Sequence, residues 1–183
     1  QGQSPYSASK IGADKLAESF YCSYELPVVT LRPFNTYGPR QSARAVIPTI
    51  ISQVLHGDVV KLGSLTTRRD FTYVSDTVSG FLKAAETNGI EGQTFNLGVG
   101  EEVTVGDLAN IIIDLIGKPV KILLEEERLR PQKSEVLRLL SDNSKARREL
   151  AWEPSVSLPE GLAQTIGWIR EHANFYQPGK YMR

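Results

Sequence analysis

Tyr6 and Lys10 place a phenol and an ammonium group four positions apart, and together these two groups can transfer a proton. Side chains four residues apart meet on one face of a helix. A phenol titrates near pH ~10 in water, so it acts as a base near neutrality only where positive charge favours the phenolate. Lys10 could supply that charge, and the pair could then serve as a general base.

The spacing of Tyr6 and Lys10 is by itself weak support for a site. A tyrosine and a lysine four residues apart are most often an ordinary pair on a helix surface. Ser7 and Lys10 also spell the Ser-x-x-Lys element of penicillin-binding acyl-transfer sites, which require both Ser-Asp-Asn and Lys-Thr-Gly further along the chain. The sequence contains no Lys-Thr-Gly, and this absence excludes that interpretation.

A helix beginning at Pro5 is predicted to position the pair. Ser4 can cap its amino terminus, and Pro5 suits the first helical turn, where a missing N–H costs nothing. Apolar residues then repeat with helical period at Ala13, Leu16, Ala17, Phe20 and Tyr24. Tyr6 and Lys10 should therefore lie one turn apart near the start of this helix.

Short β-branched runs alternate with helical patterns along the rest of the chain, which predicts an α/β fold with parallel pairing. The runs 27–32 and 94–97 are expected to be members of a central sheet, the first of them a buried strand. Residues 33–41 are expected to form a loop at the carboxyl end of the first strand, where α/β proteins place ligands. Other strands are predicted at 59–63 and 119–123, and helices at 46–55, 76–85, 105–116, 144–150 and after Ser157.

Composition and charge exclude several classes of function. The 21 basic and 21 acidic residues cancel, so no overall field attracts nucleic acid or an anionic membrane. The single cysteine, Cys22, excludes an internal disulfide and suits a reducing cytoplasm. His56 and His172 lack Cys or His partners at ligand spacing, so no zinc site is expected. No apolar run approaches the roughly 20 residues that span a bilayer, and no signal peptide is recognised, which predicts a cytoplasmic protein.

An ordered series of short motifs follows the Tyr6 and Lys10 pair. The motifs are Leu31-Arg32-Pro33-Phe34-Asn35-x-Tyr37-Gly38-Pro39, Arg69-Asp70-Phe71-x-Tyr73-Val74-x-Asp76, Asn96-Leu97-Gly98, Arg130-Pro131 and Leu150-Ala151-Trp152-x-Pro154. Over nearly the whole chain this series resembles the extended short-chain dehydrogenase/reductase family, specifically its NAD-dependent nucleotide-sugar epimerases and 4,6-dehydratases.

The resemblance implies the carboxy-terminal part of a Rossmann-type doubly wound sheet together with a small α/β substrate-binding lobe. Residues 1–45 would be the end of the Rossmann-like domain and would carry the Tyr-Lys helix. Residues 46–183 would mainly form the substrate-binding lobe, with one returning Rossmann strand near 93–98. Because the chain starts at Gln1 without methionine, we expect it to be the later part of a longer protein.

The resemblance also implies the chemistry of the Tyr-Lys pair. A tightly held NAD or NADP would take a hydride from a sugar carbon while Tyr6 removes the hydroxyl proton. Lys10 would favour the phenolate and bind the ribose of the cofactor, and Pro33 and Phe34 would lie on the nicotinamide side. Cofactor contacts are therefore expected from Tyr6, Lys10, Pro33 and Phe34.

The substrate implied by the resemblance is a nucleotide sugar, namely a UDP-, dTDP- or GDP-hexose. Its binding residues would be Asn35, Arg44, Val46, Arg69 and Arg130. Asn35 would lie near the diphosphate, Arg69 and Arg130 would neutralise it, and the helix from Val46 would cover the base. The open alternatives are that the two arginines are solvated surface charges and that Asn35 is a plain turn residue.

Several expected features of the family are absent from this sequence. They are the Gly-x-x-Gly-x-x-Gly phosphate loop, the acidic residue that selects the ribose, and the catalytic Ser or Thr upstream of the tyrosine. The isolated chain is therefore expected to be inactive, and the sequence does not separate an epimerase from a dehydratase.

The alternative function is a non-catalytic module for nucleotide-sugar binding or dimerisation. In the family, the Tyr-Lys helix packs in a dimer interface, so Ala17, Phe20 and Tyr21 would form exposed apolar surface here. We therefore expect a homodimer or a larger oligomer.

Overall fold

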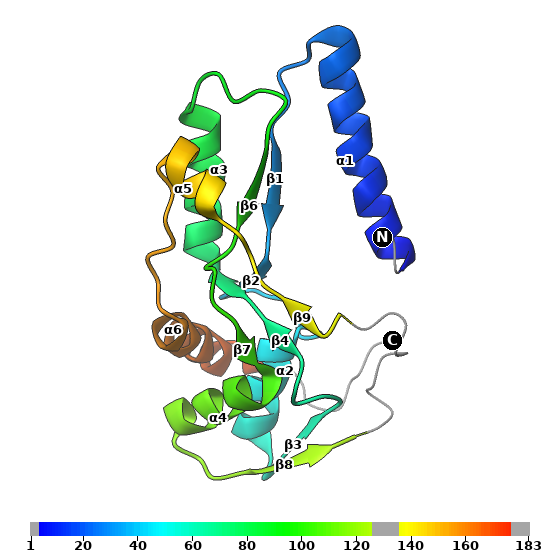
Figure 1. The fold of residues 1–183 in the computed structure, drawn as a ribbon. Coiled ribbons are helices and arrows are strands. Elements are labelled where there is room, and N and C mark those ends of the chain that lie inside the picture. The colour runs from blue at the N-terminus through cyan, green and yellow to red at the C-terminus, as the bar shows by residue number, and fades with distance from the viewer. Residues whose placement is uncertain (1–3, 126–135, 177–183) are drawn as a thin grey trace.

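A computed structural model describes residues 4–125 and 136–176 of the chain and confirms the predicted α/β class (Figure 1). Its helices are α1 (Pro5–Tyr24), α2 (Val46–His56), α3 (Val74–Glu86), α4 (Val105–Ile116), α5 (Ser144–Leu150), α6 (Leu158–Glu171) and the 3-10 helix η3 (Ala173–Phe175). Its strands are β1 (Thr30–Pro33), β2 (Asn35–Tyr37), β3 (Val59–Leu62), β4 (Arg68–Arg69), β5 (Phe71–Tyr73), β6 (Thr94–Leu97), β7 (Val103–Thr104), β8 (Lys121–Leu124) and β9 (Arg138–Leu139).

The described strands form four small sheets. β1 pairs with β6, β2 with β5 and β3 with β8, and all three pairs are parallel. β4 lies between β7, which is antiparallel to it, and β9, which is parallel. The predicted central pair is therefore confirmed, with Thr30 opposite Thr94.

Two expectations about the first strand are wrong. β1 is only partly buried, and Arg32 and Pro33 are exposed, because within the described chain it pairs with β6 alone. The predicted loop at 33–41 contains a strand, β2, because Asn35 to Tyr37 pair in register with Phe71 to Tyr73 of β5.

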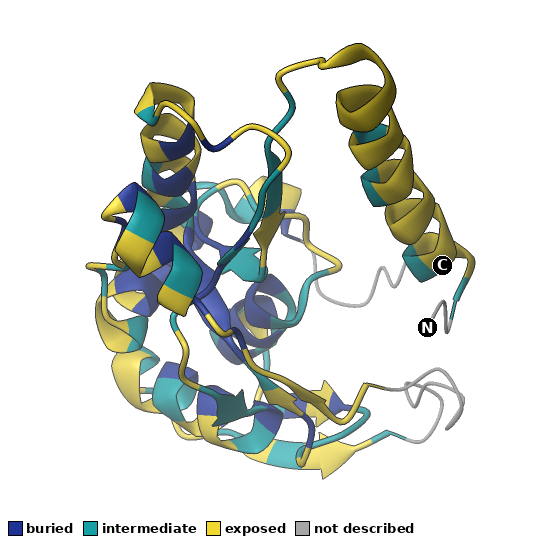
Figure 2. Cartoon of the chain, turned by 45° about the horizontal axis from the view of Figure 1, so that its top comes forward, coloured by how far each residue is buried: buried dark blue, intermediate teal, exposed yellow. Residues whose placement is uncertain are grey.

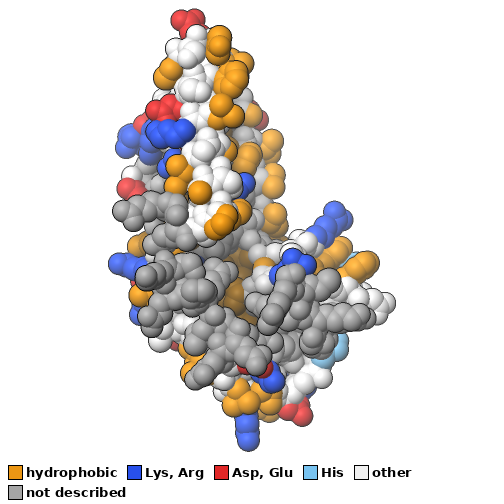
Figure 3. Space-filling view, turned by 90° about the vertical axis from the view of Figure 1, so that its right-hand side faces the viewer, with side chains coloured by type: hydrophobic (Ala, Val, Ile, Leu, Met, Phe, Trp, Pro, Cys, Tyr) orange, Lys and Arg blue, Asp and Glu red, His pale blue; other side chains and the backbone are white. Residues whose placement is uncertain are grey.

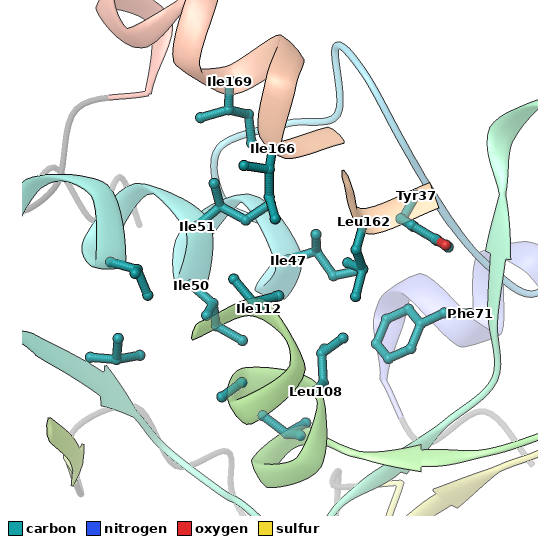
Figure 4. Close-up of a cluster of buried hydrophobic side chains, with 14 of the residues drawn as sticks. Tyr37, Ile47, Ile50, Ile51, Phe71, Leu108, Ile112, Leu162, Ile166 and Ile169 are labelled. Atoms are coloured by element: carbon teal, nitrogen blue, oxygen red, sulfur yellow. The ribbon is translucent and has the colours of Figure 1, made fainter. Parts of the chain in front are cut away.

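Two groups of buried apolar side chains hold these elements together (Figure 2). In the larger group, α2, α4 and α6 meet and pack against β2 and β5 (Figure 4). Its labelled members are Tyr37, Ile47, Ile50, Ile51, Phe71, Leu108, Ile112, Leu162, Ile166 and Ile169. The smaller group joins α3 and α5 to β6 through Ala84, Ile90, Phe95, Leu97, Ala146, Leu150 and Trp152.

A buried carboxylate links α3 to the segment that leads into α6. Asp76 accepts hydrogen bonds from the Ser155 N–H at 3.1 Å, the Ser155 hydroxyl at 2.9 Å and the Val156 N–H at 3.1 Å. The Trp152 indole N–H donates to the Asp76 carbonyl at 2.9 Å. Asp76 and Trp152, two residues of the predicted motifs, therefore have a structural explanation.

α1 lies apart from both groups, and none of its residues is buried (Figures 1 and 2). The predicted helix and its cap are confirmed, since the Ser7 N–H donates to the Ser4 hydroxyl at 3.2 Å. Toward the rest of the chain, Asp14 pairs with Arg32 of β1, and the Tyr21 ring lies against Gly92. None of the described helices is long and apolar enough to cross a lipid bilayer.

Two glycines of α6 provide a test of this packing. A Cβ at Gly161 would lie 2.2 Å from the Tyr37 hydroxyl oxygen, whereas a Cβ at Gly167 would meet nothing within 4 Å. Gly161→Ala should lower the free energy of unfolding by about 1–3 kcal/mol through overpacking. Gly167→Ala should raise it by about 0.5–1 kcal/mol, because alanine is the better helix former. Urea unfolding measures both, and effects of the same sign would contradict the packing.

Candidate functional site

Tyr6 and Lys10 lie on the same face of α1, as their spacing predicts. Lys10 Nζ is 5.6 Å from the centre of the Tyr6 ring. Both side chains are open to solvent, and the exposed fraction of Tyr6 is 72%. Asp14, one turn further along this face, pairs with Arg32 of β1 at 2.6 Å between Oδ2 and Nη2. The face that carries the pair is therefore turned toward β1.

β1 brings further predicted residues to the same end of the molecule. α1 and β1 run in opposite directions, so the start of α1 lies at the end where β1 finishes (Figure 1). Pro33 ends β1 with an exposed side chain. Phe34 is half-buried, and its N–H donates to the Leu97 carbonyl at 2.9 Å. The residues predicted for the cofactor thus come from the same end of two neighbouring elements.

Asn35 and Arg69, predicted to bind the diphosphate, are connected through Asp70, which lies between β4 and β5. Asn35 is opposite Phe71 in the β2–β5 register, two positions beyond Arg69. Asn35 Nδ2 donates to the carbonyl of Asp70 at 2.8 Å. Arg69 Nη1 donates to the Arg68 carbonyl at 2.8 Å, and the side chain is half-buried. The Asn35 amide is thus bonded to the residue that directly follows Arg69.

The other predicted substrate residues are not joined to this pair. Arg44 is exposed, and its backbone N–H donates to the Ser42 hydroxyl at 3.3 Å. Val46 starts α2 and packs against the larger apolar group. In the described part of the chain, neither is hydrogen-bonded to Asn35. Arg130 lies outside the described residues.

Asp70, for which the sequence predicted no role, is fully buried beside this pair. One carboxylate oxygen accepts from the Val99 N–H at 2.9 Å. The other accepts from the Gly100 N–H at 2.9 Å and the Ser141 N–H at 3.1 Å. A Cβ at Gly98 would lie 2.9 Å from the Asp70 carboxylate. The motifs around Asp70 and Gly98 contain the sequence signal for this buried carboxylate. A charged residue directly before a buried strand needs hydrogen-bond donors around it.

Ser141, Asp142 and Asn143 do spell the Ser-Asp-Asn element of an acyl-transfer site. Ser141 and Asn143 are buried, however, and Asn143 Nδ2 donates to the carbonyls of Gly98 at 2.7 Å and Val99 at 3.1 Å. Their contacts are structural, which agrees with the exclusion of acyl transfer that the missing Lys-Thr-Gly requires.

A cavity elsewhere in the fold carries none of the predicted residues. It lies between the loop after β2 and the end of α6, and its walls include Arg40, Trp168, His172 and Phe175. The Arg40 guanidinium lies over the Trp168 ring at 5.4 Å, and the Trp168 and His172 rings stack at 3.6 Å. Within residues 4–125 and 136–176, no group of three or more His, Cys, Asp or Glu side chains could hold a metal ion.

The chain is similar in sequence to known proteins of the family that the motif series resembles. The sequence model of a family described as GDP-mannose 4,6 dehydratase matches residues 1–165. The dTDP-glucose 4,6-dehydratase of Streptomyces griseus is 33% identical over 176 residues, which are 96% of this chain and 52% of that protein. The UDP-glucuronate 4-epimerase of Thermodesulfobacterium geofontis is 34% identical over 171 residues, covering 92% of this chain and 51% of that protein.

The fold also matches that of solved structures of such enzymes. The crystal structure of UDP-glucuronic acid 4-epimerase from Bacillus cereus, in complex with UDP-glucuronic acid and NAD, aligns with a TM-score of 0.85 and 30% identity. The alignment covers 92% of this chain and 53% of that one. The chain thus spans about half the length of the curated relatives it matches. From its motifs, its fold and these matches, the chain belongs to the GDP-mannose 4,6-dehydratase family of extended short-chain dehydrogenases/reductases.

Proposed function

We propose that this chain is part of an NAD(P)-dependent nucleotide-sugar 4,6-dehydratase or epimerase and supplies its Tyr-Lys pair and its contacts to the nucleotide sugar. The observation that carries the proposal is that Tyr6 and Lys10 share the face of α1 that Asp14 fastens to β1. Dehydratases and epimerases both occur among its relatives, which supports this reaction class without choosing between them.

In this proposal Tyr6 and Lys10 act on a sugar hydroxyl. The phenolate oxygen of Tyr6 takes the hydroxyl proton, and the Lys10 ammonium, 5.6 Å from the centre of the Tyr6 ring, is the positive charge beside it. Arg69 and Arg130 bind the diphosphate as charge-assisted donors, with Asn35 beside it and Arg44 and Val46 toward the base. The half-buried side chain of Arg69, one residue before the carbonyl to which Asn35 donates, supports its part in this arrangement.

The chain holds only part of the cofactor site. NAD or NADP, when bound, accepts the hydride. Tyr6, Lys10, Pro33 and Phe34 would contact its nicotinamide and ribose. Gly98-Val99-Gly100 follows β6 but leads to β7, so no glycine-rich loop of the described residues runs from a strand into a helix to cradle a pyrophosphate. We therefore propose that the isolated chain binds nucleotide sugar but does not turn it over. We also keep the expectation of a cytoplasmic location, which rests on the single, exposed Cys22.

The absence of turnover is directly measurable. The isolated chain, supplied with NAD or NADP and with UDP-, dTDP- or GDP-hexoses, should give no product, because the pyrophosphate site is incomplete. In a longer form that contains this site, Tyr6→Phe should lower kcat by about 100-fold or more, since it removes the proton acceptor. Robust turnover by the isolated chain, or full activity of Tyr6→Phe in the longer form, would refute the assignment.

The diphosphate site predicts a specific loss of affinity. Arg69→Ala should weaken binding of the best ligand among UDP, dTDP and GDP by about 10- to 100-fold, the usual worth of a charge-assisted hydrogen bond. Calorimetry on the isolated chain measures this. Arg148→Ala is the matched control, because Arg148 is an exposed arginine paired with Glu149 on α5. Equal affinities of Arg69→Ala and the unsubstituted chain would contradict the site.

A second candidate function, a dimerisation module, is favoured by the surface of α1. Of the residues expected to form its apolar surface, Phe20 and Tyr21 are 43% and 37% exposed, whereas Ala17 is only half-buried. Leu16 and Tyr24, 60% and 75% exposed, extend this surface. Figure 3 shows hydrophobic side chains along this helix. Such an apolar stripe is unusual for a helix that remains in water. We propose that α1 packs against a second copy of the chain, as a homodimer or a larger assembly.

Sedimentation tests this association. The unsubstituted chain should sediment as a dimer or larger species, and Leu16→Glu combined with Phe20→Glu should give monomer, because two buried charges would oppose the contact. Leu115→Glu, which changes an exposed leucine on α4, should leave the assembly intact. A compact monomer of the unsubstituted chain would count against the proposal.

A further inference from the structure

In the described structure, all the hydrogen bonds to the Asp70 carboxylate come from backbone N–H groups. Its three hydrogen bonds come from two separate segments, namely Val99 and Gly100 after β6 and Ser141 after β9. A buried carboxylate is costly unless such donors are held close to it. Asp70 therefore fixes both segments against the junction of β4 and β5.

The backbone of Asp70 joins two further elements to this junction. Its N–H donates to the Leu139 carbonyl of β9 at 3.0 Å. Its carbonyl accepts from Asn35 Nδ2 at 2.8 Å, which sets the direction of the Asn35 amide. Arg68 is anchored as well, because its N–H donates to the Leu137 carbonyl at 2.9 Å. Arg69 thus lies between two anchored residues.

We propose that Asp70 is a positioning residue of the nucleotide-diphosphate site, and that it acts by fixing Arg69 and Asn35 relative to one another. The inference rests on the proposed function, which gives Arg69 and Asn35 the diphosphate as ligand. Asp70 itself is fully buried and does not contact the ligand. A loss of its hydrogen bonds would free the β4–β5 junction and spread the guanidinium and the amide over more than one arrangement.

Asp76 provides a control of the same kind within the chain. It is 2% exposed, and its carboxylate also accepts three hydrogen bonds, from Ser155 and Val156. Those bonds hold α3 to the segment before α6 and involve neither Asn35 nor Arg69. Asp70→Asn and Asp76→Asn each place an amide NH₂ where a carboxylate oxygen accepted hydrogen bonds, so both should lose stability. Only the first should change the ligand site.

The experiment measures urea unfolding and UDP affinity for both variants of the full 183-residue chain, with dTDP and GDP as parallel probes. Asp70→Asn should weaken diphosphate binding by about 10-fold or more, whereas Asp76→Asn should change it by less than about 2-fold at a comparable loss of stability. Equal losses of affinity in the two variants, or unchanged affinity in Asp70→Asn, would overturn the inference. Binding of none of the three nucleotides by the unsubstituted chain would contradict the proposed function itself, and the inference with it.

A second variant covers the case in which Asp70→Asn does not fold. Asn143→Ala removes the donor that holds the Gly98 and Val99 carbonyls and leaves Asp70 intact. It should loosen the loop that meets the Asp70 carboxylate and weaken UDP binding by about 3-fold or more. Unchanged UDP affinity in folded Asn143→Ala would overturn the inference independently of Asp70→Asn.

Discussion

A carboxylate removed from water must be met by hydrogen-bond donors, and this requirement at Asp70 holds the centre of the fold together. Asp70 ties the loop after β6 and the turn after β9 to the junction of β4 and β5. Asp76 does the same for α3 and the segment before α6. Both aspartates belong to the motif that also contains Arg69, so one short stretch of sequence organises two parts of the structure.

The two parts of the proposed site differ in how well the rest of the chain packs around them. Asn35 and Arg69 sit on strands that the Asp70 hydrogen bonds and the larger apolar group fix in place. Tyr6 and Lys10 sit on a helix without buried residues, whose ion pair from Asp14 to Arg32 is partly exposed. Exposed ion pairs contribute little, about 0–1 kcal/mol. Substrate contacts should therefore be well formed in this chain, whereas the catalytic pair needs further protein around it.

Local patterns in the sequence predicted much of the fold. The cap at Ser4 marked the start of α1, helices were expected where α4 and α6 occur, and the β1–β6 pair was expected as a central pair. The face shared by Tyr6 and Lys10 followed from helical geometry alone. The helix starts and the shared face depend on residues close together in the chain, whereas the β1–β6 pair followed from two short runs typical of strands in an α/β pattern.

The features that were missed depend on contacts between distant residues. The three donors to Asp70 lie between 29 and 71 positions away along the chain, and no periodic pattern records such a bond. Burial of β1 was overestimated because its apolar residues do not reveal how many strands pair with it. Gly161 closely approaches the Tyr37 hydroxyl of β2, and no local pattern in α6 records that contact.

We propose that the nucleotide diphosphate binds where β2 meets the β4–β5 junction, and the sharpest test is NMR of the isotopically labelled chain during a titration with UDP. The largest shift changes are expected at the backbone amides of Asn35, Arg69 and Asp70 and at the side-chain amide of Asn35. If the largest changes occurred around the cavity of Arg40, Trp168 and Phe175, with no change at Asn35 and Arg69, this binding site would be contradicted.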